Sequence, residues 1–462
     1  MEEDHRTIRL RDILRSRKGG PTFRVLLFIF GSALKLFFRR IETVNEHLVP
    51  DGTGVIFVLN HPNGLIDPAL VFVALPRKIS FLAKSTLFRM PVISFLLKQV
   101  EALPVYRRMD AGEDVSQNLK TFAAARDLLK RGGSIALFPE GVSHNSSKML
   151  PAKTGAARIA LGAASMNEDG GKGVQIVPVG LYYTSKTTFR SEALLHFGKA
   201  FRVPSVTLDA DGDPPREDVK ALTAKIEDAL REVTINAETE AELNTADAAR
   251  GVFFSANGSG RELHKRQIFL QRYIGDQSGE RPPELAELDE KIVKFEQKLA
   301  ALKLQPEHLS LSRFTRGFVV KQAFLQTWYL LVLAPVAVIG ALLHTPAYQL
   351  CKLFAAIYSR HGADDVASTV KVLAGLVFMP LTWLIVAGAV YYFCGWQAAV
   401  LSVPTSFLTG YIALVTLEDL EELRGWARAI RMFFTKKESF LRLYVERNDL
   451  QEGLQRLGLT HE

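Results

Sequence analysis

A histidine and an aspartate stand close together in the segment that runs from Asn60 to Pro68. A neutral imidazole can take a proton from a hydroxyl near pH 7. A carboxylate on its other ring nitrogen fixes the tautomer and stabilises the imidazolium that forms. Asn63 and Gly64 permit a sharp turn that would return Asp67 to the ring of His61. The pair could therefore activate a hydroxyl for acyl transfer from a thioester, although an isolated pair of this kind is also common as a structural contact.

Two adjacent arginines, Arg107 and Arg108, form a second polar signature. They follow directly after the short apolar stretch 103–106. Because a guanidinium group binds phosphate through two parallel hydrogen bonds, the pair could hold a phosphorylated substrate. The alternative is a basic pair on the protein surface.

The third signature is Phe-Pro-Glu-Gly-Val-Ser at residues 138–143. It places the carboxylate of Glu140 beside Gly141, whose missing side chain lets the backbone approach a ligand closely. The alternative is an ordinary turn from a strand into a loop, with the glutamate facing solvent.

Apolar runs precede these signatures and predict the strands that position them. Runs of this length and composition are typical of buried strands, and a helical pattern over 115–130 ends at Gly132 and Gly133. Strands that alternate with helices predict an α/β sheet with both faces covered, and functional groups in such sheets lie just past the strand ends. The predicted strands are 55–59, 79–83, 103–106, 134–138 and 174–181.

Four segments together resemble the glycerolipid acyltransferase superfamily, which acylates glycerol-3-phosphate and lysophosphatidate. They read Asn-His-Pro-Asn-Gly-Leu-Ile-Asp-Pro, Leu-Pro-Val-Tyr-Arg-Arg, Phe-Pro-Glu-Gly-Val-Ser and Ile-Val-Pro-Val-Gly-Leu-Tyr-Tyr. The four segments occur in the order that the superfamily has, and the resemblance covers roughly residues 25–235. It implies an α/β acyltransferase domain with a central sheet covered by helices.

The resemblance implies a role for individual residues. His61 matches the catalytic base and Asp67 its orienting acid. Arg107 or Arg108 matches the arginine that contacts the glycerol phosphate, and Lys84 is similar to a lysine that would be a second phosphate ligand.

The later segments match the acceptor and donor regions of the superfamily. Glu140 and Gly141 match the acceptor site, with Ser143 beside them, and Pro178 matches a proline linked to acyl-donor or structural roles. The resemblance implies no metal and no bound cofactor. The co-substrate would be acyl-CoA or an acyl group on acyl carrier protein.

Five residues separate His61 from Asp67, one more than in the commonest form of the first segment. The longer spacing resembles the branch that acylates glycerol-3-phosphate or dihydroxyacetone phosphate, so the expected product is lysophosphatidate. Acylation of lysophosphatidate or another lysophospholipid is the alternative within the enzyme class. A membrane lipid-binding scaffold on an acyltransferase fold is the alternative outside it.

Charge and composition favour a membrane partner. The chain has a net charge of +8 and a pI near 9.3, which suits an anionic membrane surface or a phosphorylated substrate. It carries no nucleic-acid motif, so no nucleic-acid partner is expected. Its two cysteines, Cys351 and Cys394, cannot form a disulfide framework. The apolar stretch 23–38 contains Arg24 and Lys35 and predicts an interfacial or re-entrant helix, with a buried core helix as the alternative.

The pattern along the chain predicts five regions. Three apolar stretches, 318–343, 372–394 and 396–417, are long enough to cross a bilayer, unless one of them is re-entrant. The basic cluster after Arg424 favours the cytoplasmic side for the tail. We therefore expect an integral protein of the bacterial inner membrane or endoplasmic reticulum with its catalytic domain at the cytoplasmic face. The regions are an N-terminal segment with the interfacial helix (1–41), the acyltransferase domain (42–235), a polar helical insert (236–317), membrane-spanning or re-entrant helices (318–417) and a charged helical tail (418–462).

Overall fold

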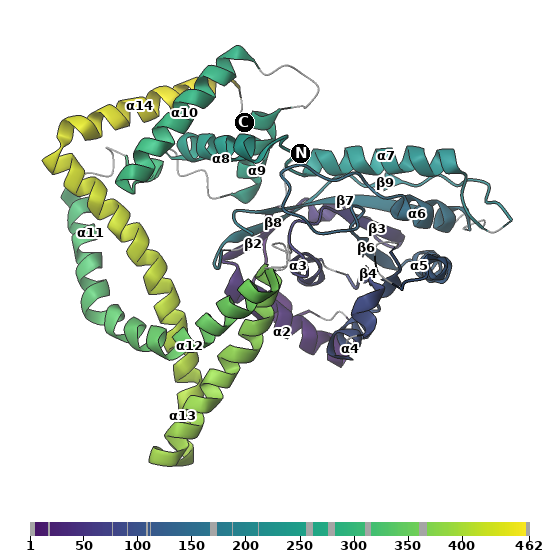
Figure 1. Ribbon diagram of the computed structural model, residues 1–462, viewed down its shortest axis with the longest axis horizontal. Coiled ribbons are helices and arrows are strands. Elements are labelled where there is room, and N and C mark those ends of the chain that lie inside the picture. Colours follow the sequence, from purple (N-terminus) through teal and green to yellow (C-terminus); the bar gives the residue numbers. More distant parts are fainter. Residues whose placement is uncertain are drawn as a thin grey trace. The chain divides into compact units, whose positions relative to one another are not determined.

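The structure is a computed structural model in which two compact units are distinguished (Figure 1). Met1–Asn236 with Gly362–Thr369 form the first unit, and Ala237–His361 with Val370–Glu462 form the second. The residues that the structure describes are 5–16, 19–75, 77–89, 91–107, 110, 112–166, 173–186, 188–210, 212–255, 262–275, 282–309, 316–359 and 367–458.

The first unit is built on a mixed sheet. Among the described residues its strand order is β1-β2-β8-β7-β3-β6-β4-β5, and β9 also pairs with β7. The pairs of β3 with β6 and β7, of β4 with β5 and β6, and of β2 with β8 are parallel, whereas β7 pairs with β8 in the antiparallel sense. The strands are β1 (His5–Thr7), β2 (Arg40–Val44), β3 (Gly54–Leu59), β4 (Ser80–Lys84), β5 (Leu103–Val105), β6 (Ser134–Leu137), β7 (Val174–Tyr183), β8 (Glu192–Phe197) and β9 (Phe201–Arg202).

Helices lie on both sides of this sheet. Figure 1 shows α7 on one side and α3 on the other. The core on the α7 side joins alternate strand residues such as Ile56 and Val58 to residues of α5, α6 and α7, as expected for a strand whose side chains alternate between faces. The helices of this unit are α1 (Leu10–Leu14), α2 (Pro21–Phe37), α3 (Ile66–Ala74), α4 (Pro91–Gln99), α5 (Asn118–Lys130), α6 (Gly155–Ser165) and α7 (Arg216–Val233).

Helix α2 corresponds to the helix predicted over 23–38. One face is buried and contacts α3, where the rings of Phe23 and Phe72 are 4.8 Å apart. The opposite face leaves Val25, Phe28 and Ile29 exposed by 57, 44 and 41%. The helix therefore packs on the domain through one apolar face and presents a second one outward.

The second unit is helical in its described part. Helices α8 (Glu240–Phe254), α9 (Leu263–Ile274), α10 (Pro283–Leu302) and α14 (Lys437–Arg456) pack together. On α10 the buried residues Leu285, Ile292, Phe295 and Leu299 recur at helical spacing.

Two helical stretches of this unit, Gly317–Ile357 and Val370–Thr435, are long and apolar enough to cross a membrane. The first comprises α11 (Arg316–Trp328), a π-helical turn (Tyr329–Leu333) and α12 (Ala334–Ser359). The second lies within α13 (Ala367–Thr435), whose helix is broken at Gly395 with φ 81° and ψ 177°.

The break at Gly395 folds α13 into two antiparallel arms. Trp383 and Phe407 stand at equal distances in sequence before and after Gly395, and their ring centroids are 5.5 Å apart. Such a contact requires the chain to reverse direction, and Figure 1 shows the ribbon turning back there. The arms correspond to the second and third predicted apolar stretches.

Candidate active site

His61 lies directly beyond the end of β3, in the short connection to α3. The preceding residue, Asn60, fixes this strand end to β7. Its side-chain oxygen accepts a hydrogen bond from Leu181 N over 2.7 Å, and its Nδ2 donates to Leu181 O over 3.1 Å. Because β3 is completely buried and pairs with β6 and β7, the backbone at His61 follows a strand that is held on both sides.

Asp67 stands in the first turn of α3 and faces His61. Its Oδ2 lies 2.8 Å from His61 Nδ1 and accepts a second hydrogen bond, of 2.7 Å, from Asn63 N. Since an ionised carboxylate can only accept, Nδ1 carries the hydrogen and Nε2 of the neutral ring is left as the proton acceptor. The His61 ring also stacks on Phe138, with centroids 4.0 Å apart. The two predicted catalytic residues therefore form an oriented pair with the nitrogen of a general base available.

Tyr183, the last residue of β7, holds the other oxygen of the same carboxylate. Its hydroxyl donates to Asp67 Oδ1 over 2.6 Å. Burial, and then the negative charge of Asp67, raise the pKa of Tyr183 well above its ordinary value, so it remains a hydrogen-bond donor. This role was not predicted from the sequence. Tyr183 ends the fourth motif and lies on the same face of β7 as the buried Leu181.

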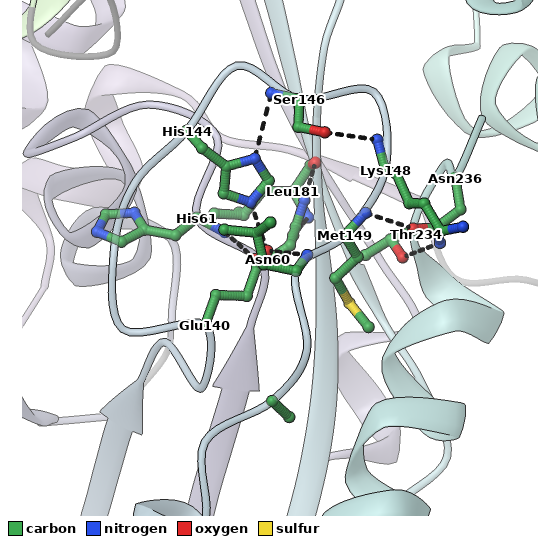
Figure 2. A network of polar contacts seen from close by, with 12 residues as sticks. Asn60, His61, Glu140, His144, Ser146, Lys148, Met149, Leu181, Thr234 and Asn236 are labelled. Atoms are coloured by element: carbon green, nitrogen blue, oxygen red, sulfur yellow. Dashed lines mark hydrogen bonds and ion pairs between the residues drawn. The ribbon is translucent and has the colours of Figure 1, made fainter. Parts of the chain in front are cut away.

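Glu140 is buried, with 2% of its surface exposed, and its carboxylate binds protein groups (Figure 2). Oε1 accepts from His61 N over 3.0 Å, and Oε2 accepts from Leu150 N over 2.8 Å and from His144 Nε2. Nδ1 of His144 accepts from Ser146 N over 3.2 Å, which leaves the ring hydrogen on Nε2. The geometry gives Glu140 a positioning role between the backbone at His61 and the following loop; its predicted contact with the acceptor stays a prediction.

The loop after Gly141 is tied to the fold at its far end as well. Met149 N donates to Asn236 Oδ1 over 3.1 Å, and Ala152 N donates to Glu227 over 3.2 Å. Lys153 N donates to Pro139 O over 2.8 Å. Figure 2 shows the contacts that run from His61 through Glu140 and His144 to Ser146, and the separate hydrogen bond of Met149 with Asn236. Side chains on this loop are therefore presented from a fixed backbone.

Arg107 and Lys84 meet at Asp110. Arg107 Nε and Nη2 lie 3.0 and 3.1 Å from the two Asp110 oxygens, and Lys84 Nζ is 3.1 Å from Oδ1. The hydrogen bond from Arg107 is the main cause that lowers the pKa of Asp110. Arg107 Nη1 also donates to Gly141 O over 2.8 Å. The structure thus brings together two of the three predicted phosphate-binding cations, while Arg108 lies outside the described residues.

Three further predicted residues take different places. Gly141 has φ +74°, and an added Cβ would lie 2.6 to 3.1 Å from atoms of the Lys153 side chain, so this position favours glycine. Ser143 lies two residues further along the loop. Pro178 is buried inside β7 opposite Val58, and its carbonyl accepts from Gly198 N over 2.8 Å, which gives it a place in the sheet. Among the described residues, no group of three His, Cys, Asp or Glu side chains could hold a metal ion.

Comparison with known proteins identifies the same segment. Residues 40–182 match the family model described as Acyltransferase. The chain is 27% identical over 285 residues to glycerol-3-phosphate O-acyltransferase 2 of Saccharomyces cerevisiae, covering 58% of this chain and 37% of that protein. It is 23% identical over 451 residues to an uncharacterized acyltransferase of Schizosaccharomyces pombe, covering 77% of this chain and 66% of the relative.

Relatives named for the other acceptor match a shorter part. The chloroplastic 1-acyl-sn-glycerol-3-phosphate acyltransferase BAT2 of Brassica napus is 29% identical over 154 residues, which cover 33% of this chain and 40% of the relative. The matched part of the chain thus spans less than two thirds of these relatives' lengths. These matches confirm the resemblance to the glycerolipid acyltransferase superfamily.

Proposed function

We propose that this chain, whose residues 40–182 form an acyltransferase domain, transfers a fatty acyl group from an acyl thioester to the hydroxyl of glycerol-3-phosphate or dihydroxyacetone phosphate. The product would be lysophosphatidate or its dihydroxyacetone counterpart, in phospholipid synthesis. The observation that carries the proposal is the Tyr183–Asp67–His61 relay, which leaves Nε2 of His61 as a proton acceptor at the end of β3. Acyl-CoA or acyl carrier protein would supply the acyl group.

Transfer proceeds without a covalent enzyme intermediate. Nε2 of His61 takes the proton of the acceptor hydroxyl as the oxygen attacks the thioester carbonyl. The carboxylate of Asp67 stabilises the imidazolium that forms. When the tetrahedral intermediate collapses, the carbon–sulfur bond breaks and the leaving thiolate takes the proton from His61. The acceptor phosphate would bind beside Lys84 and Arg107, which already converge on one carboxylate.

The choice of acceptor rests on two observations. The five-residue spacing between His61 and Asp67 resembles the glycerol-3-phosphate branch, and the yeast relative named for that acceptor matches 58% of this chain. The second candidate is acylation of lysophosphatidate, which the matches to 1-acyl-sn-glycerol-3-phosphate acyltransferases favour.

The site would act at a membrane surface. The exposed residues of the two long apolar helices include Leu331, Leu342 and Leu384, each at least 64% exposed. Such surfaces are costly in water and suit a lipid environment. The outward apolar face of α2 would lie in the interface, where the acyl chain could remain in lipid. We place the catalytic domain at the cytoplasmic face because of the basic cluster that follows the last apolar stretch.

An acceptor panel tests the proposal. The purified chain is given a labelled acyl group on CoA or on acyl carrier protein, with glycerol-3-phosphate, dihydroxyacetone phosphate, lysophosphatidate or lysophosphatidylcholine. We expect the highest kcat/KM with the first or second acceptor. A clear preference for lysophosphatidate would replace the proposal by the second candidate. Absence of product with any acceptor and with either acyl carrier would favour a lipid-binding scaffold.

A further inference from the structure

Lys153 lies against the catalytic loop although no motif includes it. Its side chain runs along Gly141: an added Cβ on that glycine would lie 2.6 Å from Lys153 Nζ and 2.9 Å from Cδ. The stem therefore covers the bare face of the glycine that follows Glu140. Its backbone is fixed by the hydrogen bond from Lys153 N to Pro139 O. The ammonium group is thus held near the loop by packing and not only by its charge.

Lys153 and Arg107 both lie against Gly141, but at different atoms of that residue. Arg107 Nη1 donates to the carbonyl of Gly141, while the Lys153 stem lies on its Cα side. The adjacent Glu140 binds the backbone nitrogen of His61. Arg107 and Lys153 therefore both lie against Gly141, the residue next to Glu140, whose carboxylate positions His61.

The positive charges of Lys84, Arg107 and Lys153 are compensated to different extents. Lys84 and Arg107 share the carboxylate of Asp110. In the described part of the chain, neither a carboxylate nor a hydrogen-bond acceptor partners the Nζ of Lys153, and the residue is exposed. The lysine also stands immediately before Thr154, the N-cap of α6, and a cation is electrostatically unfavourable beside the positive end of a helix. An anion bound at this point would offset both effects.

The start of α6 is open on the Cβ side of Gly155. Gly155 has no atom within 4 Å of the point where a Cβ would stand, so the start of α6 is not covered by other groups. Because Lys153 is exposed, a phosphate group could approach its ammonium group from solvent. The stem would remain on Gly141 while the three donors of the ammonium group point outward.

We propose that Lys153 binds a phosphate group of a substrate, either the phosphate of the acceptor or a phosphate of the acyl carrier. This inference rests on the proposed acyl transfer and adds a ligand to it. Both sources present the same chemistry, a solvated phosphate oxygen. Which substrate supplies it is decided by the kinetic parameter that responds to loss of the charge.

The test compares Lys153→Met with wild type in the full-length protein. Methionine keeps the unbranched stem on Gly141 and removes the charge. KM is measured for glycerol-3-phosphate at saturating acyl-CoA, and for acyl-CoA at saturating glycerol-3-phosphate. We expect one of the two KM values to rise about ten- to a hundredfold, the range for loss of a hydrogen bond to a charged group, while kcat changes little. Lys153→Arg should restore most of the affinity.

The control is Lys220→Met, which makes the same charge change at an exposed position of α7. It should leave both KM values as in wild type. A raised KM for glycerol-3-phosphate assigns the acceptor phosphate, and a raised KM for acyl-CoA assigns the carrier phosphate. Unchanged KM values in an active, folded Lys153→Met protein would overturn the inference.

A binding measurement separates this inference from the proposed function. Calorimetric titration of His61→Ala with glycerol-3-phosphate and with acyl-CoA reports affinity without turnover. Adding Lys153→Met should weaken one ligand by the same factor as in the kinetics. If the methionine variant does not fold, Lys153→Gln takes its place in both assays. A wild-type protein that acylates no acceptor would contradict the proposed function. If the wild type is active and the Lys153 variants have the same KM values and affinities, only the role of the lysine is contradicted.

Discussion

The hydroxyl of Tyr183 donates to Oδ1 of Asp67 over 2.6 Å, on the oxygen that His61 does not contact. The other oxygen receives both Nδ1 of His61 and the backbone nitrogen of Asn63. A fully buried carboxylate needs such donors because its charge is otherwise strongly disfavoured. Tyr183 therefore helps to fix the angle at which Asp67 faces the ring of His61, and it does so from β7 instead of from the motif that contains the pair.

Tyr183→Phe should lower kcat while the KM of the acceptor stays near wild type. The ring keeps its packing, but Asp67 loses a donor and with it part of its fixed orientation. A hydrogen bond to a charged group contributes about 1.5–3 kcal/mol, so kcat should fall by about ten- to a hundredfold. Steady-state kinetics with glycerol-3-phosphate measures both values. The control is Tyr182→Phe, since the neighbouring residue faces the opposite side of the strand. Full kcat in Tyr183→Phe would contradict the positioning role.

Glu140→Gln should lower thermal stability and kcat more than it raises the acceptor KM. The amide group that replaces one oxygen cannot accept the hydrogen bonds from both His61 N and Leu150 N, so a buried donor loses its partner. We expect a loss of about 1–3 kcal/mol in the free energy of unfolding. Denaturation and kinetics are compared with those of Glu217→Gln in the first turn of α7. A large rise in acceptor KM at unchanged stability would instead support the direct acceptor contact that the family resemblance implies.

Sequence patterns predicted the strands that carry the site because those strands are buried on both faces. The runs at 55–59 and 134–138 are continuously apolar, as expected for central strands, and they coincide with β3 and β6. Strands β2 and β8 escaped prediction because charged residues shorten their apolar runs: Arg40 and Glu42 lie within β2, and Glu192 begins β8. These charges form ion pairs with one another, at 3.0 and 3.2 Å, which permits their partial burial.

The site itself was predictable where its contacts are local. His61 and Asp67 meet across one turn, so the spacing of the two residues in the sequence was enough to predict their contact. The contact of Tyr183 with Asp67 joins residues 116 positions apart, and only the pairing of β7 with β3 brings them together. The same holds for Asp110, whose role between Lys84 and Arg107 depends on how β4 and β5 pair. The motifs therefore identified the candidate site residues, whereas the contacts that support them could be seen only in the folded structure.

Arg107→Ala should mainly raise the KM for the phosphorylated acceptor. The substitution removes a guanidinium group that could bind phosphate, together with its ion pair with Asp110 and its contact with Gly141 O. We expect an increase of about ten- to a hundredfold, from the contribution of hydrogen bonds to charged groups. The comparison is Arg131→Ala, which removes an exposed arginine at the end of α5. An acceptor KM that does not respond to Arg107→Ala would remove the arginine from the phosphate site.

The two arms of α13 should cross a bilayer as a hairpin. The arm from Val370 to Cys394 is about 37 Å long at 1.5 Å per residue, enough for the hydrocarbon core. Cys394 next to the turn should then lie on the face opposite to the tail after Thr435. In a Cys351→Ala background it is the sole cysteine. Sealed vesicles are treated with an impermeant maleimide, and protease access to the tail reports their orientation.

Labelling of Cys394 should occur only in vesicles whose tail is protected from protease. Detergent-opened vesicles give the maximum labelling as a control. If the cysteine is labelled in the same vesicles whose tail is cleaved, the hairpin does not cross the membrane.

The most direct measurement compares the wild-type chain with His61→Ala in transfer of a labelled acyl group from acyl-CoA to glycerol-3-phosphate. Loss of a general base should reduce kcat by about 10²–10⁴-fold. Thermal denaturation and calorimetric binding of glycerol-3-phosphate should remain close to wild type, because Asp67 keeps its bonds to Asn63 and Tyr183. We expect lysophosphatidate from the wild type and almost none from a folded His61→Ala protein. Substantial turnover by that variant would contradict the role of His61 as the base.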